Sequence, residues 1–423
     1  MSVQILHGDI AYSESPQALS IHENAYMAVE DGAVRGIWPQ VPETYAALPV
    51  TDYGRGLIIP AFSDLHIHAS QFLQRGVGMD CLLFDWLERY TFPQESNFRD
   101  PAYAEAVYGA LVRELLRHGT FHASLFTTIH YDASDYLFWA LEKYGMRAFV
   151  GKVNMDRNSP DFLRESTEES LRETERFVRN HAGNGRVQPI LTPRFAPTCS
   201  EGLMKGLGEI AARYGCGIQT HLCESREEVT TALELYSSCG CDAEIYARAG
   251  LLDHGPSIFA HVIFPSPRDK ELMHQAGSVA VHCPDATINI TAGIMPAARL
   301  AEEGLSIALG TDVGGGHGMG IYRQAARAVQ ASKVKEFYEP ENRRLTFPEA
   351  FYLATAGGGR CFGPVGTFKE GSRFDALVIQ GVEDPGFPMA PAERLERFCY
   401  IGDDRNITAR YIDGAKLNLF DGK

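Results

Sequence analysis

Long apolar runs are missing from this sequence, and so is an excess of basic residues. No uninterrupted apolar stretch approaches membrane-spanning length, and the first twenty residues lack the basic segment and apolar core of a secretory signal. The chain has 39 Lys and Arg against 54 Asp and Glu, a formal net charge of −15. Because nucleic-acid binding needs a basic surface, we expect no nucleic-acid partner, no membrane partner and a small neutral or cationic substrate.

A disulfide framework is also missing. The nine cysteines are an odd number, and all are scattered singly except Cys239 and Cys241. Such a distribution in a long chain indicates a reducing compartment, so we expect a cytoplasmic protein. Cys239-Gly240-Cys241 lacks the two-residue spacer and the second pair of a zinc knuckle, and we interpret it as structural.

Glycine motifs for nucleotides are absent as well. No G-x-G-x-x-G follows a strand, no Walker A motif occurs, and Gly314-Gly315-Gly316 is interpreted as a flexible turn. With 423 residues, the chain exceeds the usual size of one domain. We therefore expect either two domains or one large domain with an accessory part.

The sequence does contain a regular alternation of short apolar runs with amphipathic helical segments. The apolar runs cover residues 57–68, 120–129, 146–155, 186–195, 216–222, 257–263, 277–283 and 305–312. The helical segments between them include Pro101–Arg117, Thr167–His181, Gly202–Arg213 and Arg226–Tyr236. Eight such units predict an α/β fold of the (β/α)8 TIM-barrel type, with a doubly wound open sheet as the alternative.

Both ends of the chain read as strands. An extended run lies in residues 3–12, and residues 24–38 predict a hairpin around Asp31-Gly32. Residues 366–379 predict two short extended runs around Glu370-Gly371, and residues 410–419 predict a hairpin around Asp413-Gly414. We predict a composite β-sandwich domain from residues 1–58 plus 363–423 and a barrel domain from residues 59–362.

Polar residues able to bind a metal lie at the ends of several predicted strands. His66 and His68 end the first strand and, with the two-residue strand period, point to the same side. Taken alone, this pair is more often two unrelated strand histidines. His221, His261 and Asp312 end three further strands, and parallel strand ends gather at one face of a barrel. Three imidazoles and a carboxylate suit zinc or iron(II), with one position left for water.

Glu224 follows His221 closely enough to turn back toward the same site. A carboxylate that is not itself a ligand can take a proton from water and pass it to a substrate nitrogen. The alternative is that Glu224 opens the next helix, where a carboxylate favours the positive end of the helix dipole. Both roles are compatible.

Several motifs resemble the amidohydrolase superfamily and, within it, the guanine deaminase family. The superfamily motifs are PAFSDLHIH, THLCE, FAHV, HCP and ALGTD, in that order. Longer segments resemble guanine deaminases, among them HIHASQFLQRG, WLERYTFPQE, FVGKVNMD, STEESLRETERFV, TPRFAPTCSEGLM, GTDVGGG and YIGDDRNI. The resemblance covers nearly the whole predicted barrel and extends into the C-terminal strands. It implies zinc-dependent hydrolytic deamination of guanine to xanthine and ammonia by a homodimer.

The resemblance also implies a role for each site residue. One zinc ion per chain is expected at His66, His68, His221 and Asp312. The catalytic residues are expected to be Glu224, which shuttles the proton to the purine N3 side, Asp312, a base for water, and His261, which bonds the water or the tetrahedral intermediate. The substrate contacts are expected to be His68, Gln71, Arg194, Phe195, His221, Glu224 and Asp312. An amide pairs with a purine edge, a guanidinium bonds a carbonyl such as O6, and an aromatic ring stacks. Taken alone, Arg194 could equally be a structural ion-pair partner. Trp86 and Phe92 are candidates either for closing the pocket or for core packing.

The sequence departs from the family pattern at three positions. Val262 stands where the family usually carries a glycine, and Asp285 and Thr287 replace part of an Asn- and Ser-rich segment. These positions lie on loops that can line the pocket, so 8-oxoguanine, pterins and aminotriazines remain alternative substrates.

Three other functions have to be weighed. A cytidine-deaminase-type zinc fold needs H-x-E and P-C-x-x-C, and neither motif occurs. A binuclear cyclic-amide hydrolase needs a bridging ligand, for which Lys152 is the candidate. A non-catalytic binding barrel would be indicated by a lost ligand or proton shuttle, and the sequence retains them all.

Overall fold

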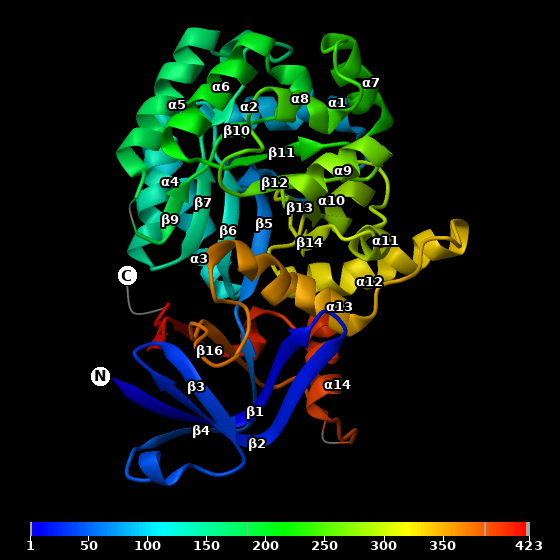
Figure 1. Ribbon diagram of the computed structural model, residues 1–423. Helices are drawn as coiled ribbons and strands as arrows, with labels where there is room; N and C mark the ends of the chain where they lie inside the picture. Colours follow the sequence, from blue (N-terminus) through cyan, green and yellow to red (C-terminus); the bar gives the residue numbers. More distant parts are fainter. Residues whose placement is uncertain (1, 184, 385, 420–423) are drawn as a thin grey trace.

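The protein consists of a barrel stacked on a curved sheet (Figure 1). The computed structural model describes residues 2–183, 185–384 and 386–419. Its strands are β1 (Val3–Ser15), β2 (Ala18–Glu30), β3 (Ala33–Trp38), β4 (Val50–Pro60), β5 (Phe62–His68), β6 (Thr120–Phe126), β7 (Arg147–Gly151), β8 (Val153–Asn154), β9 (Val187–Pro189), β10 (Thr192–Pro193), β11 (Ile218–Leu222), β12 (Ser257–His261), β13 (Val279–His282), β14 (Ser306–Leu309), β15 (Ala376–Ile379), β16 (Ile407–Ile412) and β17 (Ala415–Lys416).

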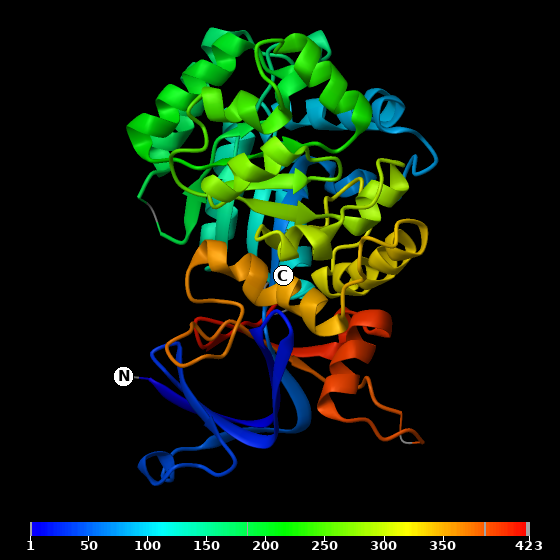
Figure 2. The ribbon, with the colours of Figure 1, turned by 45° about the vertical axis from the view of Figure 1, so that its right-hand side comes forward.

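The helices cover the outside of the barrel and one side of the sheet (Figure 2). They are α1 (Leu83–Trp86), α2 (Phe92–Ser96), α3 (Pro101–Arg117), α4 (Tyr131–Lys143), α5 (Thr167–His181), α6 (Glu201–Tyr214), α7 (Arg226–Leu235), α8 (Asp242–Arg248), α9 (Pro267–Gln275), α10 (Pro284–Asn289), α11 (Ala297–Glu302), α12 (Ile321–Tyr338), α13 (Phe347–Tyr352) and α14 (Pro391–Ile401). The predicted bounds of α3 and α5 are confirmed, α6 extends one residue further at each end than predicted, and α7 ends one residue earlier than predicted. None of the described helices is both long enough and apolar enough to cross a bilayer.

Eight parallel strand positions close the predicted barrel. Hydrogen bonds join β5-β6-β7-β9 and β11-β12-β13-β14 into two four-stranded sheets. Leu191, just after β9, connects them, because its N–H donates to Gly217 and its carbonyl oxygen accepts from the N–H of Gln219. On the other side the N–H of Asp312 donates to His66 and the N–H of His68 to Val313. All eight runs predicted from the sequence contribute to this ring, and the fold-class prediction of a TIM-type barrel is confirmed.

The first predicted barrel strand is corrected at its start. The apolar run at residues 57–60 belongs to β4 of the other sheet, where Leu57 to Pro60 pair antiparallel with β15. The chain then leaves that sheet at Ala61, whose N–H donates to the carbonyl oxygen of Asp375. The barrel strand begins only at Phe62. One continuous apolar run therefore serves two sheets and links them directly.

Strands from both ends of the chain form one seven-stranded sheet, in the order β17-β16-β15-β4-β1-β2-β3. It curves around its own buried apolar cluster, and continuous hydrogen bonding makes it a single sheet where we expected a two-sheet sandwich. The hairpins at Asp31-Gly32 and Asp413-Gly414 form as predicted, and all four turn residues have positive φ. The first extended run predicted around Glu370-Gly371 is wrong, since residues 366–372 form turns and only β15 is a strand. The exact domain boundaries stay a prediction.

Candidate metal centre and substrate pocket

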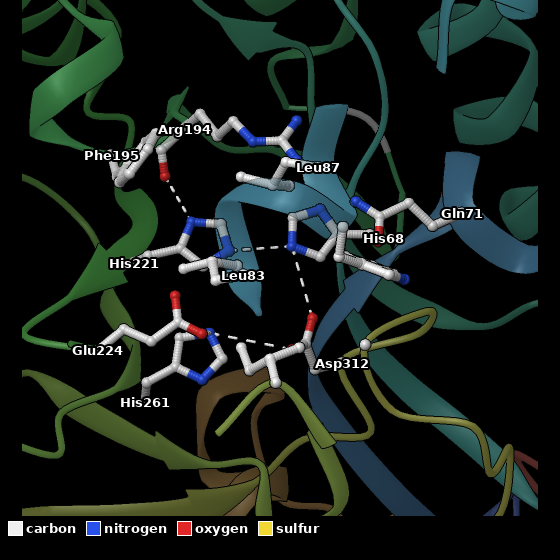
Figure 3. Close-up of a pocket in the computed structure, with 13 residues that line it drawn as sticks. His68, Gln71, Leu83, Leu87, Arg194, Phe195, His221, Glu224, His261 and Asp312 are labelled. Carbon is white, nitrogen blue, oxygen red and sulfur yellow. Dashed lines mark hydrogen bonds and ion pairs between the residues drawn. The ribbon is translucent and has the colours of Figure 1, made fainter. Parts of the chain in front are cut away.

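The predicted metal-binding side chains meet at one end of the barrel. Figure 3 shows His68, His221, His261 and Asp312 facing one another. His66 and His68 come from β5, His221 from β11, His261 from the end of β12 and Asp312 from the loop after β14. All five are buried. The Nε2 atoms of His68 and His221 are 2.9 Å apart, and Oδ1 of Asp312 lies 3.3 Å from Nε2 of His66 and 3.5 Å from Nε2 of His68.

These distances fit a single bound cation. Four ligands at the usual zinc distances of about 2.0 to 2.1 Å stand about 3.3 Å from one another around a tetrahedron. The Nε2 atom of His66 is buried and has no hydrogen-bond partner among the described residues, so its lone pair is available to a metal. Two groups of potential ligands share this residue. They are His66, His221 and His261, and His66, His68 and Asp312.

The histidines carry the protonation state that metal binding needs. Burial and the positive charge of Arg194 lower the pKa of His66 to about 3. Burial also lowers the pKa of His68, His221 and His261, with the other imidazoles adding to the effect. All four rings are therefore neutral at pH 7 and can offer a nitrogen lone pair.

Asp64 braces the strand that carries two of the histidines. Its carboxylate accepts hydrogen bonds from the N–H of Thr311 at 3.0 Å, from the Thr311 hydroxyl at 2.5 Å and from the N–H of His66 at 3.3 Å. Thr311 is next to Asp312 in the chain. Asp64 therefore fixes the end of β5 against the segment that carries the candidate carboxylate ligand.

Left-handed backbone conformations turn the chain at three of the strand ends. Cys223, His261 and Asp312 have φ values of 53°, 76° and 47°. Such angles are uncommon outside glycine and cluster at functional sites. The turn at Cys223 lets Glu224 fold back toward the barrel axis, where its Oε1 atom lies 3.5 Å from Nε2 of His261.

Glu224 and Asp312 are both buried, and their carboxyl groups are close enough to interact electrostatically. Burial and the neighbouring charge of Asp312 raise the pKa of Glu224 to about 8, against the opposing effect of Arg194. Burial likewise raises the pKa of Asp312 to about 8 against the effect of Arg194. Carboxyl groups tuned in this way can take up and release protons near neutral pH. A cation held by the histidines would lower both values.

The predicted substrate-binding residues line a pocket next to this cluster. The lining residues are His68, Gln71, Leu83, Trp86, Leu87, Arg194, Phe195, His221, Glu224, His261, Ile290, Asp312 and Gly315. Trp86 thus contributes to the pocket wall. Phe92 does not line the pocket. Its ring lies under the guanidinium group of Arg194, whose Cζ atom is 5.5 Å from the ring centroid.

Glu95 is a site residue that sequence reasoning missed. It lies in α2, is buried, and accepts one hydrogen bond from Gln71 and one from Arg194, both at 2.8 Å. The residue stands within the segment WLERYTFPQE, which carries part of the family resemblance. No spacing rule points to it, because it lies on a short helix and not at a strand end.

The three departures from the family pattern lie outside the pocket lining. Asp285 turns toward α12, where it accepts a hydrogen bond from Gln324 and pairs with Arg327. The hydroxyl of Thr287 donates to the carbonyl oxygen of Cys283, and Val262 is fully buried with a φ of 45°. The reason for expecting another amino-heterocycle as substrate is therefore weakened.

Lys152, the candidate bridging ligand of a binuclear site, is engaged elsewhere. Its ammonium lies 2.6 Å from Glu165, and burial lowers its pKa while Glu165 opposes that shift. Because Glu165 holds this ammonium group in an ion pair, the geometry favours one ion over two.

Comparison with known proteins agrees with this site. The amidohydrolase family model matches residues 57–417. The chain belongs to the amidohydrolase family. It is 38% identical over 380 residues to a guanine deaminase of Dictyostelium discoideum, covering 88% of this chain and 84% of the relative. It is 37% identical to human guanine deaminase over 382 residues, which cover 86% of this chain and 83% of the relative.

A solved structure extends the comparison to three dimensions. The crystal structure of guanine deaminase from C. acetobutylicum, with bound guanine in its active site, has a TM-score of 0.96 to this chain. The two are 38% identical, and the match covers 99% of this chain and 100% of the other. Amidohydrolases are metal-dependent, and the buried His and Asp cluster of this chain has the donor atoms that could hold a metal ion.

Proposed function

We propose that this chain is an enzyme that converts guanine and water into xanthine and ammonia. The observation that carries the proposal is the position of Glu224 and Asp312, which face the same pocket as Gln71 and Arg194. Proton-transfer groups and groups that fit a purine edge therefore border one cavity. The guanine deaminases among the relatives, with 37–38% identity over most of the chain, support the same reaction.

We propose that His66, His68, His221 and Asp312 hold one zinc ion per chain. Three imidazole nitrogens and one carboxylate oxygen are a donor set that zinc prefers, although iron(II) also binds such sets. When bound, zinc would lower the pKa of water far below its ordinary value, to about 7, and would so make hydroxide available at neutral pH. His261 remains free to bond the reacting groups.

The proposed chemistry of the chain's own residues is proton transfer. Asp312 accepts a proton from the water whose oxygen adds to C2 of guanine, and Glu224 delivers a proton to N3. Nε2 of His261, 3.5 Å from Glu224 and 4.0 Å from Asp312, donates to the oxygen added at C2. Glu224 then takes the proton of the hydroxyl group added at C2 and passes it to the exocyclic nitrogen, so that the C2 oxygen becomes a carbonyl, the C2–N2 bond breaks and ammonia leaves. The proton held by Asp312 returns to Glu224, which restores both carboxyl groups to their starting states. Water supplies the oxygen of xanthine, so the atoms balance.

The remaining pocket residues are proposed to hold the base in place. Arg194 donates to the O6 carbonyl, Gln71 pairs with ring nitrogens, and the Phe195 ring packs against the purine. His68 and His221 border the reacting edge, as do Glu224 and Asp312. Apolar side chains from α1 and the turn after it, Leu83 and Leu87, exclude water from the bound substrate.

A substrate panel tests the proposal. Ammonia release should be measured with guanine, 8-oxoguanine, pterins, adenine, cytosine and aminotriazines at equal concentrations. We expect the highest kcat/KM for guanine. Strong preference for another amino-heterocycle would overturn the substrate assignment and leave the deaminase chemistry in place, and release from none of them would overturn both.

Two further proposals concern the protein as a whole. We propose that it forms a homodimer, as the family resemblance implies, and light scattering after gel filtration tests this. We also propose a cytoplasmic location, which agrees with nine cysteines that are all unpaired and all lie in the described part of the chain. Cell fractionation tests the location.

A further inference from the structure

Glu95 connects the two residues proposed to recognise the purine. Its Oε1 atom accepts a hydrogen bond from Nε2 of Gln71, and its Oε2 atom accepts one from Nη1 of Arg194, each at 2.8 Å. Gln71 lies just after β5 and Arg194 just after β10, and both line the pocket. Glu95 lies in α2 and contacts these two side chains without lining the pocket itself. Its carboxylate is only 2% exposed.

We propose that Glu95 is a positioning residue that sets the hydrogen-bond pattern and the charge of the purine pocket. The inference rests on the proposed function, since it concerns how the same pocket chooses its substrate. Glu95 acts through Gln71 and Arg194 and does not line the pocket itself.

The hydrogen-bond pattern follows from the amide of Gln71. A carboxylate only accepts hydrogen bonds, so the nitrogen of the amide must face Glu95. The N–H of Gly314 only donates, and it lies 3.2 Å from Oε1 of Gln71, so the oxygen must face Gly314. Both ends of the amide are thereby fixed, and one N–H and one oxygen lone pair remain for the substrate.

The charge of the pocket follows from the ion pair with Arg194. This guanidinium is buried, with 4% of its side chain exposed, and on its own would attract anions. Glu95 neutralises it while leaving the other guanidinium N–H groups free to donate to a carbonyl oxygen. A neutral pair suits a neutral base such as guanine and disfavours purines that carry a negative charge at neutral pH, such as urate.

Glu95 also fastens the segment that covers the pocket. Leu83 and Trp86 of α1 line the pocket, and α2, which follows after a single turn, carries both Glu95 and the Phe92 ring under Arg194. The two oxygens of the Glu95 carboxylate therefore attach this covering segment to two pocket-lining residues from different parts of the chain, Gln71 and Arg194.

The main test is Glu95→Gln, which keeps the size of the side chain and removes its charge. A neutral amide cannot accept from both Gln71 and Arg194, so we expect KM for guanine to rise about 10- to 100-fold, with kcat changed less than about threefold. We expect urate, used as an anionic inhibitor, to bind at least tenfold more tightly. Calorimetry with urate measures this second effect without turnover.

Glu95→Asp separates the effect of the side chain's charge from the effect of its length. The shorter carboxylate keeps the pocket neutral but cannot contact both partners, so we expect KM for guanine to rise while urate affinity stays near that of the wild type. If Glu95→Gln does not fold, the KM of this variant still decides the issue. An unchanged KM in either folded variant would overturn the proposal.

The matched control is Glu165→Gln. Glu165 is also a buried carboxylate in an ion pair, with Lys152, and lies outside the pocket lining. Both Glu→Gln changes break a buried pair and lower stability, but only Glu95→Gln should change KM and urate affinity. An equal rise in KM for the control would show a merely structural role and overturn the proposal.

A double-mutant cycle shows whether Glu95 acts through Gln71. We expect Glu95→Gln to raise KM much less in a Gln71→Ala background than in the wild type. Additive effects would contradict positioning of the amide. Deamination of guanine by the wild type tests the proposed function separately, and urate binding still tests Glu95 if the wild type prefers another substrate.

Discussion

The Nδ1 atom of His221 lies 2.5 Å from the backbone carbonyl oxygen of Arg194, to which it donates a hydrogen bond. This bond fixes the tautomer of His221, so its Nε2 lone pair faces the candidate metal position. The side chain of the same Arg194 lines the purine pocket. One residue thus orients a proposed metal ligand with its backbone and lines the proposed substrate pocket with its side chain.

The first prediction separates these two roles. Arg194→Lys leaves the carbonyl oxygen in place, so we expect the metal content per chain to stay unchanged. The lysine loses the planar fork that contacts Glu95 and the substrate together, and we expect KM for guanine to rise about 10- to 100-fold. Metal analysis and steady-state kinetics measure the two effects, and loss of metal would contradict the separation.

The second prediction concerns Glu224 as the proton carrier. Glu224→Gln should keep the metal and lower kcat by about 100- to 10,000-fold, because an amide cannot take up or release the proton. Glu227→Gln, an exposed carboxylate three residues further along, is the control and should leave kcat unchanged. Near-wild-type turnover of Glu224→Gln would refute the assignment.

The third prediction concerns the number of metal ions. We expect close to one zinc ion per chain, loss of activity on chelation, and recovery when one equivalent of zinc is added back. Asp312→Asn should bind zinc more weakly, since it removes the carboxylate near both His66 and His68. Lys152→Met should keep the metal content, and two ions per chain in the wild type would contradict a mononuclear site.

The barrel and the gathering of the candidate metal-binding side chains could be predicted because each follows from a local pattern. Every barrel strand is an apolar run, β5 and β12 end in histidines, and His221 is the second-last residue of β11. The number of runs predicts the barrel, and the barrel places their ends together. Position in the strand thus carried most of the information about the site.

Other features depend on residues far away in the chain. The boundary between β4 and β5 at Ala61 lies inside one apolar run. It depends on the antiparallel pairing of β4 with β15 and on the hydrogen bond from the N–H of Ala61 to the carbonyl oxygen of Asp375. Glu95 is recognisable only once Gln71 and Arg194 are seen on either side of it. Likewise, Asp285 looked like a pocket residue until α12 supplied Gln324 and Arg327 as its partners. Such contacts have no signature in sequence spacing.

The carboxylate of Asp375 links the terminal sheet to the barrel through hydrogen bonds and an ion pair. Its Oδ2 atom lies 3.0 Å from Nε2 of His122 in β6 and 3.7 Å from Nε of Arg147 in β7, while its Oδ1 accepts from the N–H of Asp413 at 2.7 Å. Burial alone would raise the pKa of Asp375, but the hydrogen bonds and the neighbouring positive groups outweigh it and lower the pKa below its ordinary value. The carboxylate therefore stabilises the folded protein while it is ionised.

The fourth prediction follows from the sign of that shift. Because the folded pKa is lowered, the stabilisation is fully present above the unfolded pKa of about 4 and is lost as the pH falls through the folded value. Asp375→Asn should reduce the free energy of unfolding at pH 7 by about 1 to 3 kcal/mol. This difference from the wild type should shrink between about pH 5 and pH 2, because the carboxylate of Asp375 becomes protonated over that range. Urea unfolding across this pH range measures it. Asp52→Asn is the control, since Asp52 is exposed and solvent screens its hydrogen bond with His7. A difference from wild type that stays constant down to pH 2 would contradict the assignment.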